Sequence, residues 1–193
     1  MAEVTFIIPT LGRPTLERTI YSLSQQTIPT WKAFVIWDGV SIDKIIEHKD
    51  KRVSNIPLEN KLGHAGLVRN VAFPYITTEW MAFVDDDDWL DPHYIEAMDS
   101  YLESRPDLDV IIFTYHDRVN RNIQPPLGTT DFVACSVGIS FAVRTNFVLN
   151  NLISFTEGGV EDFRFLDDCR NKGAKYLVTN DIKYYVGGRG GWR

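Results

Sequence analysis

The sequence has little cysteine, little positive charge and no long apolar run, and each of these shortages excludes a class of protein. Its two cysteines, Cys135 and Cys169, lie far apart and form neither a disulfide framework nor a zinc-binding spacing, which suits a reducing compartment. The longest uncharged stretch, Phe132–Val143, is shorter than the roughly 20 residues that cross a bilayer. The chain starts with strand-like residues, so we predict no signal peptide. We therefore expect a cytoplasmic protein without a membrane span.

Acidic residues outnumber basic ones, with 26 Asp and Glu against 20 Lys and Arg and a net charge of −6. Nucleic-acid binding depends on neutralising phosphates with basic residues, so we expect no nucleic-acid partner. The hydrophobic fraction of 44% is that of an ordinary globular protein. Because a domain typically has about 150 residues, we expect one domain over residues 1–193, and the sequence has no internal repeat.

Short apolar runs alternate with stretches of helical spacing. Strands are predicted at 4–8, 31–37, 53–56, 80–84, 107–113, 132–141, 176–178 and 182–186. Helices are predicted from residues 15 and 92 and over 42–46, 66–72, 144–149 and 161–172, and a long loop over 118–130. This alternation favours an α/β sandwich with a mostly parallel sheet. Ligands bind beyond the carboxyl ends of such strands, where Pro9–Thr10, Asp38–Gly39 and Asp85–Asp88 fall.

Four consecutive aspartates, Asp85–Asp88, follow the most apolar predicted strand. Neighbouring carboxylates repel one another and are costly to bury, and a Mg²⁺ or Mn²⁺ ion shared with substrate phosphates would offset that cost. In extended chain Asp86 and Asp88 would share a face while Asp87 points elsewhere. No His or Cys group accompanies them, which argues against zinc. From spacing alone, a hydrated acidic turn before the Asp91–Pro92 helix start stays an equal alternative.

An ordered set of short motifs covers nearly the whole chain. It consists of Val4–Thr10 with Arg13–Pro14, Ser22–Thr27, Phe34–Gly39, Gly63 with Arg69–Asn70, Ala82–Leu90, and Glu161–Phe163 with Arg170 and Gly173. In this order the motifs resemble the family-2-like nucleotide-sugar glycosyltransferases of the GT-A fold. The resemblance implies a Rossmann-like, three-layer α/β sandwich with a central mixed, mostly parallel sheet. It also implies a nucleotide-binding half over about 1–115 and an acceptor-binding half over about 116–193.

The resemblance assigns roles to most of the motif residues. Pro9 and Thr10 would border the nucleotide base and Asp38 would accept a hydrogen bond from uracil, while Arg69 would lie along the diphosphate. Asp86 and Asp88 would hold Mn²⁺ or Mg²⁺ as the family's DxD element, although the register within four aspartates is ambiguous by one residue. Asp87 would contact ribose or sugar, and Trp89 would stack on the sugar. The full donor-binding set that the resemblance implies is Pro9, Thr10, Arg13, Asp38, Gly63, Arg69, Asp86, Asp87, Trp89 and Glu161.

Asp162, in the Glu161–Asp162 pair, matches the residue that acts as general base in inverting members of the family. The alternative is that both acids merely favour a helix N-terminus. The chain departs from the family at Trp37–Gly39, where many members have Asp-Asp-Gly, and it has no histidine after His116 to serve as a third metal ligand. Tyr184, Tyr185 or the glycine-rich tail are candidates to border the donor instead, with Trp192 as a lid over it.

Taken together, these features predict a metal-dependent glycosyltransferase that moves a sugar, most simply from a UDP-sugar, to a glycan or other hydroxyl acceptor with inversion. Two other classes stay open. A nucleotidyltransferase would need a Gly- and Lys-rich phosphate loop, for which Leu11–Arg13 is a thin substitute. A non-catalytic module that binds sugar nucleotides or glycans would not need a base at Asp162. The chain fits either a complete small enzyme or one module of a larger transferase, and its glycine-rich end favours the module.

Overall fold

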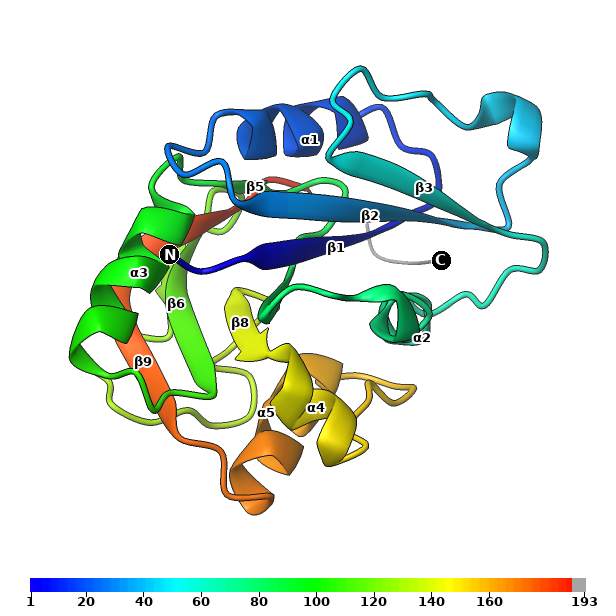
Figure 1. Ribbon diagram of the computed structural model, residues 1–193. Helices are drawn as coiled ribbons and strands as arrows, with labels where there is room; N and C mark the ends of the chain where they lie inside the picture. The colour runs from blue at the N-terminus through cyan, green and yellow to red at the C-terminus, as the bar shows by residue number, and fades with distance from the viewer. Residues whose placement is uncertain (189–193) are drawn as a thin grey trace.

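One mixed sheet runs through the molecule and carries helices on its faces (Figure 1). The computed structural model of the protein describes residues 1–188. Within them, nine strands form the sheet in the order β3-β2-β1-β4-β8-β6-β9-β5, and β7 pairs with β6 at the side. The strands are β1 (Val4–Thr10), β2 (Trp31–Asp38), β3 (Val53–Leu58), β4 (Trp80–Phe83), β5 (Trp89–Leu90), β6 (Val110–Asp117), β7 (Asn122–Gln124), β8 (Phe141–Arg144) and β9 (Tyr176–Val186). The helices are α1 (Leu16–Ser24), α2 (Ala65–Asn70), α3 (Tyr94–Ser104), α4 (Thr145–Asn150) and α5 (Glu161–Asn171), with short 3₁₀ turns η1 (Ile42–Lys44) and η2 (Phe73–Tyr75).

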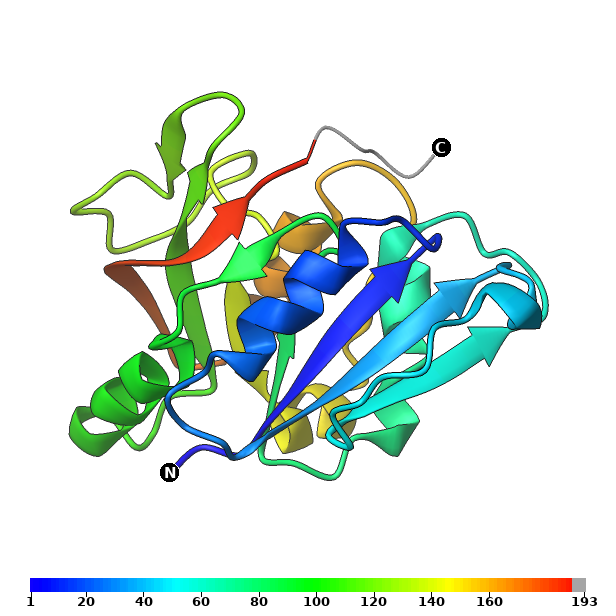
Figure 2. The ribbon, with the colours of Figure 1, turned by 90° about the horizontal axis from the view of Figure 1, so that it is seen from above.

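The strands that run parallel to one another have their carboxyl ends at one edge of the sheet. Strands β3, β2, β1 and β4 are parallel neighbours. Strand β8 is antiparallel to both β4 and β6, so β6 runs parallel to β4 again, and β9 runs parallel to β6. Figure 2 shows the arrowheads of β1 and β2 pointing the same way. The predicted mixed, mostly parallel α/β sheet is therefore confirmed.

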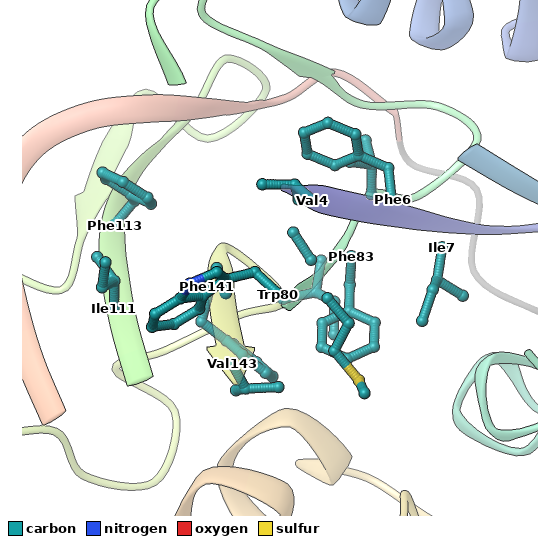
Figure 3. Packing of buried hydrophobic residues seen from close by; sticks show 14 of the residues in the cluster. Val4, Phe6, Ile7, Trp80, Phe83, Ile111, Phe113, Phe141 and Val143 are labelled. Atoms are coloured by element: carbon teal, nitrogen blue, oxygen red, sulfur yellow. The ribbon is translucent and has the colours of Figure 1, made fainter. Parts of the chain in front are cut away.

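The strands form because their apolar runs are covered on both faces. Every residue of β1 and β4 is buried, and α1 lies on one side of the β1–β2 sheet while α2 lies on the other (Figure 1). Trp31, Trp37 and Trp80 are core residues, as the sequence predicts. Figure 3 shows Phe6 on one side of β1 and Ile7 and Phe83 on the other, so both faces of the sheet carry buried apolar side chains. Each fully buried large apolar side chain contributes roughly 1.5–3 kcal/mol to stability.

A cluster of phenylalanines joins the first part of the chain to the last. Phe83 of β4 packs edge-on against Phe155 at 5.1 Å and against Phe141 of β8 at 5.3 Å. Phe155 stacks in turn on Phe165 of α5, with ring centroids 4.3 Å apart. Aromatic pairs in these geometries stabilise by about 0.5–1.5 kcal/mol beyond their buried area. The strand that precedes the four aspartates and the helix that begins at Glu161 therefore share one core.

The segment 132–141, predicted as a strand, is mostly irregular, and that prediction is wrong. Only its last residue belongs to β8. A turn in which the Ser136 N–H donates to the Val133 carbonyl interrupts the extended chain, and Phe132 packs edge-on against Phe163 and Tyr176. Cys135, expected to be a buried apolar side chain, is exposed and has a left-handed backbone with a φ of 66°, while Cys169 is buried as expected.

Three smaller differences concern strands and turns. The predicted loop 118–130 contains β7, which forms a hairpin with the end of β6. The two strands predicted at 176–178 and 182–186 are one strand, β9, with an irregular register between its two parts. The helix predicted over 42–46 is the short turn η1. Within residues 1–188, no helix is long and apolar enough to cross a membrane, and Trp192 lies outside this range.

Candidate active site

The carboxyl ends of β1 and β4 bring the predicted donor-binding residues together. The Thr10 hydroxyl, fully buried, donates to Asp86 Oδ2 at 2.6 Å. Arg13 donates from the loop after β1 to Asp86 Oδ1 at 3.0 Å and lies 3.4 Å from Asp87 Oδ2. Pro9 is buried within β1, paired with Ile36 of β2. Thr10, Arg13 and the aspartates thus form one cluster.

Asp38 and Gly63, both predicted to bind the donor, meet at the end of β2. Asp38 is 1% exposed, and its two carboxylate oxygens accept the N–H groups of Leu62 at 2.6 Å and Gly63 at 2.9 Å. Gly63 has a φ of 78°, a conformation that glycine adopts without strain. Asp38 therefore fixes the loop before α2, and a carboxylate has further lone pairs for a ligand.

The four aspartates, which we call the acidic turn, do not continue the strand. Strand β4 ends at Phe83, and the Asp88 N–H donates to the Asp85 carbonyl at 3.1 Å, so that Asp85–Asp88 form a turn. The premise that Asp86 and Asp88 share a face in extended chain is therefore wrong. Asp86 faces Thr10 and Arg13, whereas Asp88 faces β9.

The acidic turn is not a hydrated bend. Asp86, Asp87 and Asp88 are between 1% and 9% exposed, while the Asp85 side chain is 32% exposed. Burial raises the pKa of the Asp86 and Asp88 carboxyls, and neighbouring aspartates reinforce the effect. Burial and mutual repulsion thus both disfavour the ionised carboxylates, a cost that a bound cation would offset.

The oxygen-only donor set of the acidic turn fits a hard divalent cation. Within the described residues, no three His, Cys, Asp or Glu side chains are arranged to hold a metal ion. Mg²⁺ is commonly bound by one or two carboxylates together with substrate phosphates, and carboxylate oxygens also suit Mn²⁺. The side chains of the turn therefore fit an ion whose remaining ligands come from a phosphorylated substrate.

The first helix supports the acidic turn through residues that sequence reasoning did not single out. The Thr19 hydroxyl donates to the Asp88 carbonyl at 2.7 Å, and Arg18 donates to the Asp87 carbonyl at 2.5 Å. The Arg18 guanidinium also lies 4.4 Å from the centre of the Trp89 ring, which stacks on Tyr185 at 5.7 Å. The Trp89 ring, predicted to stack on sugar, thus already has two side-chain contacts.

Arg69 of α2 lies between the acidic turn and α5. It is 2% exposed, and its guanidinium contacts Asp85 at 2.5 Å and Glu161 at 3.2 Å, with Asp162 Oδ1 at 4.0 Å. It was predicted to lie along the diphosphate. Its guanidinium has carboxylate partners from two distant segments, so it links the acidic turn to the start of α5.

Asp162 combines access with a raised pKa. Its side chain is 25% exposed, yet Oδ1 is buried and has no hydrogen-bond partner within the described residues. Burial raises the pKa of Asp162 to about 7; Arg69 opposes this shift, and Asp85 and Glu161 add to it. A carboxylate with a pKa near neutrality is suited to take a proton from a substrate hydroxyl.

The amino-acid sequence of the chain matches a known family. Residues 5–164 fit the sequence pattern described as Glycosyl transferase family 2. The chain belongs to this family. The family predicted from the ordered motifs is thus confirmed, and the acidic turn, Arg69 and Asp162 all lie within the matched segment.

Two curated relatives are glycosyltransferases. The chain is 29% identical over 129 residues to the uncharacterized glycosyltransferase MJ1057 of Methanocaldococcus jannaschii, a match that covers 62% of this chain and 44% of the relative. It is 33% identical over 92 residues to the UDP-Glc:alpha-D-GlcNAc-diphosphoundecaprenol beta-1,3-glucosyltransferase WfgD of Escherichia coli, a match that covers 45% of this chain and 36% of the relative. The matched region thus spans less than half the length of either relative.

Solved structures support the GT-A fold. S. aureus TarS 1–349 in complex with UDP-GlcNAc has a TM-score of 0.81 at 20% identity, with coverage of 98% of this chain and 59% of that one. The mannosyltransferase PcManGT from Pyrobaculum calidifontis, in complex with GDP-Man and Mn²⁺, has a TM-score of 0.73 at 14% identity, with coverage of 99% and 59%. The predicted GT-A sandwich is confirmed.

Proposed function

We propose that the protein transfers a sugar from a nucleotide diphosphate sugar, UDP-linked in the simplest case, to a hydroxyl group of a glycan or other acceptor. Arg69 carries this proposal, because its buried guanidinium brings the acidic turn and Asp162 into one site. The name of WfgD, which specifies UDP-Glc, and the UDP-GlcNAc complex of TarS support a UDP-sugar donor. The GDP-Man and Mn²⁺ complex of PcManGT supports a divalent cation and leaves the nucleotide base to be tested.

On this proposal, the residues at the ends of β1, β2 and β4 bind the donor. Asp86 and Asp88, in the register predicted from the sequence, would each supply carboxylate oxygen to the cation, and Asp87 and Arg13 lie beside Asp86. Pro9, Thr10, Asp38 and Gly63 border the nucleotide, and Trp89 and Glu161 border the sugar. When bound, Mn²⁺ or Mg²⁺ supplies positive charge that stabilises the leaving diphosphate. Arg69 holds Asp85 and Glu161 in place around this site.

Asp162 is the proposed general base. As the bond from the acceptor oxygen to the sugar C1 forms, the bond from C1 to the diphosphate oxygen breaks, and the acceptor proton passes to a carboxylate oxygen of Asp162. The products are the glycosylated acceptor with inverted configuration and the nucleoside diphosphate. Asp162 is suited to this step because part of its side chain is open to solvent and its pKa is raised to about 7.

Replacement of the base tests this function. We expect Asp162→Asn to fold normally and to lose sugar transfer by roughly 10²–10⁴-fold, the usual range for general-base catalysis. A panel of UDP- and GDP-sugars with simple glycoside acceptors, assayed with Mn²⁺ and with EDTA, provides the measurement. Asp168→Asn, an exposed position on the same helix, is the matched control and retains activity.

The same assay separates the proposal from its alternatives. Release of nucleoside diphosphate indicates sugar transfer, whereas release of pyrophosphate would indicate a nucleotidyltransferase. Donor binding without turnover in any mixture would identify a binding module. Transfer by Asp162→Asn at the wild-type rate would remove Asp162 from the role of base.

A further inference from the structure

One tyrosine hydroxyl connects the first and last residues of the acidic turn. The Tyr184 hydroxyl of β9 donates to Asp88 Oδ2 at 2.7 Å and accepts the Asp85 N–H at 3.2 Å. Tyr184 is 1% exposed, so water does not substitute for either partner. Hydrogen bonds to a charged group are among the stronger ones in proteins, and a buried carboxylate without its donor is costly. The hydroxyl therefore fixes both the path of the turn and the rotamer of Asp88.

The chain just after Tyr184 holds the other oxygen of the same carboxylate. The Gly187 N–H donates to Asp88 Oδ1 at 2.9 Å, so both oxygens of Asp88 are oriented by β9 and its continuation. Asp86 is oriented by different groups, the Thr10 hydroxyl and the Arg13 guanidinium. Each hydrogen-bonded carboxylate oxygen keeps a second lone pair, so these contacts aim the carboxylate without using up its capacity to bind an ion.

We propose that Tyr184 is a positioning residue for the cation of the donor complex. It acts through Asp88 and the backbone of Asp85, and it does not touch the substrate. This inference rests on the proposed function, because it takes the acidic turn to be the seat of the cation. Tyr184 lies after the last family motif, in the part of the chain that has no histidine to serve as a third metal ligand. On our proposal, this part of the chain supplies the Tyr184 hydroxyl, which holds the metal ligand Asp88 in place.

Tyr184→Phe tests the role because it removes the hydroxyl and leaves the ring. Tyr101→Phe is the matched control. The Tyr101 hydroxyl also donates to a carboxylate, that of Asp181 in β9 at 2.8 Å, but Asp181 is not part of the acidic turn. We would measure UDP affinity by calorimetry across a series of Mn²⁺ concentrations and with EDTA, and the melting temperature of each protein. If Tyr184→Phe is not recovered folded, Tyr184→Met takes its place, because a flexible thioether side chain fills irregular space.

Mn²⁺ should increase the affinity for UDP, and the Mn²⁺ concentration that gives half of this increase is the quantity compared. For Tyr184→Phe we expect this concentration to rise on the order of tenfold, as for loss of one hydrogen bond to a charged group. The UDP affinity in EDTA should stay at the wild-type value, because the nucleotide contacts are unaltered. The Mn²⁺ concentration for half-maximal donor turnover should rise by the same factor. Tyr101→Phe should match the wild type in its Mn²⁺ dependence of UDP affinity, its UDP affinity in EDTA and its Mn²⁺ dependence of donor turnover.

Three outcomes would overturn the proposal, and they differ in whether the proposed cation site is also wrong. If Tyr184→Phe shows the wild-type Mn²⁺ dependence, or loses UDP affinity equally with Mn²⁺ and with EDTA, Tyr184 has a structural role only and the proposed function stands. If the UDP affinity of the wild type does not respond to Mn²⁺, the cation seat itself is wrong, and the role of Tyr184 is lost with it.

Discussion

Asp162 has one buried carboxylate oxygen and a side chain that is partly open to solvent. Its Oδ1 atom is buried and accepts no hydrogen bond from residues 1–188, while a quarter of its side chain is exposed. The family resemblance named Asp162, Glu161, Thr10 and residues of the acidic turn as candidate site residues. It could not predict that Arg69 would contact Asp85 and Glu161, because these residues lie 16 and 92 positions away in the chain.

The pKa of Asp162 predicts the pH dependence of transfer. A general base must be deprotonated, and its pKa is raised from the ordinary 3.8 to about 7, first by burial. We therefore expect kcat/KM to fall as the pH drops below about 7, with roughly a tenfold loss per unit further down. A pH profile of kcat/KM at saturating Mn²⁺ measures this limb. A profile that is flat between about pH 5 and 8 would contradict the assignment.

The same titration has an opposite consequence for stability. Between 3.8 and about 7 the folded state binds a proton at Asp162 that the unfolded state releases, so this group favours folding at low pH and loses that contribution as the pH rises through about 7. Asp162→Asn cannot titrate. Its melting temperature relative to the wild type should accordingly be higher at pH 8 than at pH 5, which thermal unfolding at the two values measures.

At the scale of elements, the residues just after β9, Gly187 and Gly188, which we call the β9 exit, pass very close to the acidic turn. A methyl group at Gly187 would overlap the Trp89 ring and lie 2.6 Å from the Arg18 guanidinium and 2.9 Å from the Asp87 carbonyl oxygen. A methyl group at Gly188 would overlap the Asp87 carboxylate. Only glycine permits this approach, which also gives Asp88 the Gly187 N–H as a donor.

We therefore expect Gly187→Ala to destabilise the protein by about 1–3 kcal/mol, the usual cost of overpacking. Gly159→Ala is the matched control, because a methyl group there meets no atom within 4 Å, and we expect it to change stability by less than about 0.5 kcal/mol. Urea unfolding of both variants provides the measurement. Equal midpoints for Gly187→Ala and the wild type would show that the β9 exit is not held against the turn.

Elements with strong apolar patterns were predictable, and those formed by tertiary contacts were not. Strands β1, β2 and β4 are near-continuous apolar runs, and the sequence located them to within one or two residues. The irregular segment 132–140 has the same apolar composition, but Phe132 turns aside to pack on Phe163 and Tyr176. Likewise, the acidic turn bends because the Asp88 N–H donates a hydrogen bond to the Asp85 carbonyl. Four identical side chains in a row do not predict this backbone hydrogen bond.

At the scale of the whole molecule, the sheet is continuous from β3 to β5. The order of the motifs predicted the family and the fold class, because parallel strands must alternate with crossovers. It did not predict that β9 would run between β6 and β5, since that pairing joins residues far apart in the chain. We propose that 1–193 is one domain whose nucleotide-binding half, about 1–115, and acceptor-binding half, about 116–193, share a single core.

Cooperative unfolding tests this single domain. Trp31, Trp37, Trp80 and Trp89 all lie in the first half, so tryptophan fluorescence reports on that half once Trp192→Phe removes the fifth tryptophan. Circular dichroism reports on the helices and strands of both. Because the phenylalanine cluster spans the halves, we expect the two signals to give the same urea midpoint. Separate midpoints would indicate two independently folding units.

The contrast between the two cysteines gives the protein a single reactive site for a dye. Burial raises the pKa of the Cys169 thiol to about 12, whereas Cys135 is exposed on the segment that Phe132 anchors to α5. A maleimide dye should therefore attach to Cys135 alone. In Trp192→Phe the remaining tryptophans all lie in the other half, so energy transfer from them to the dye would report the separation of the halves as ligands are added.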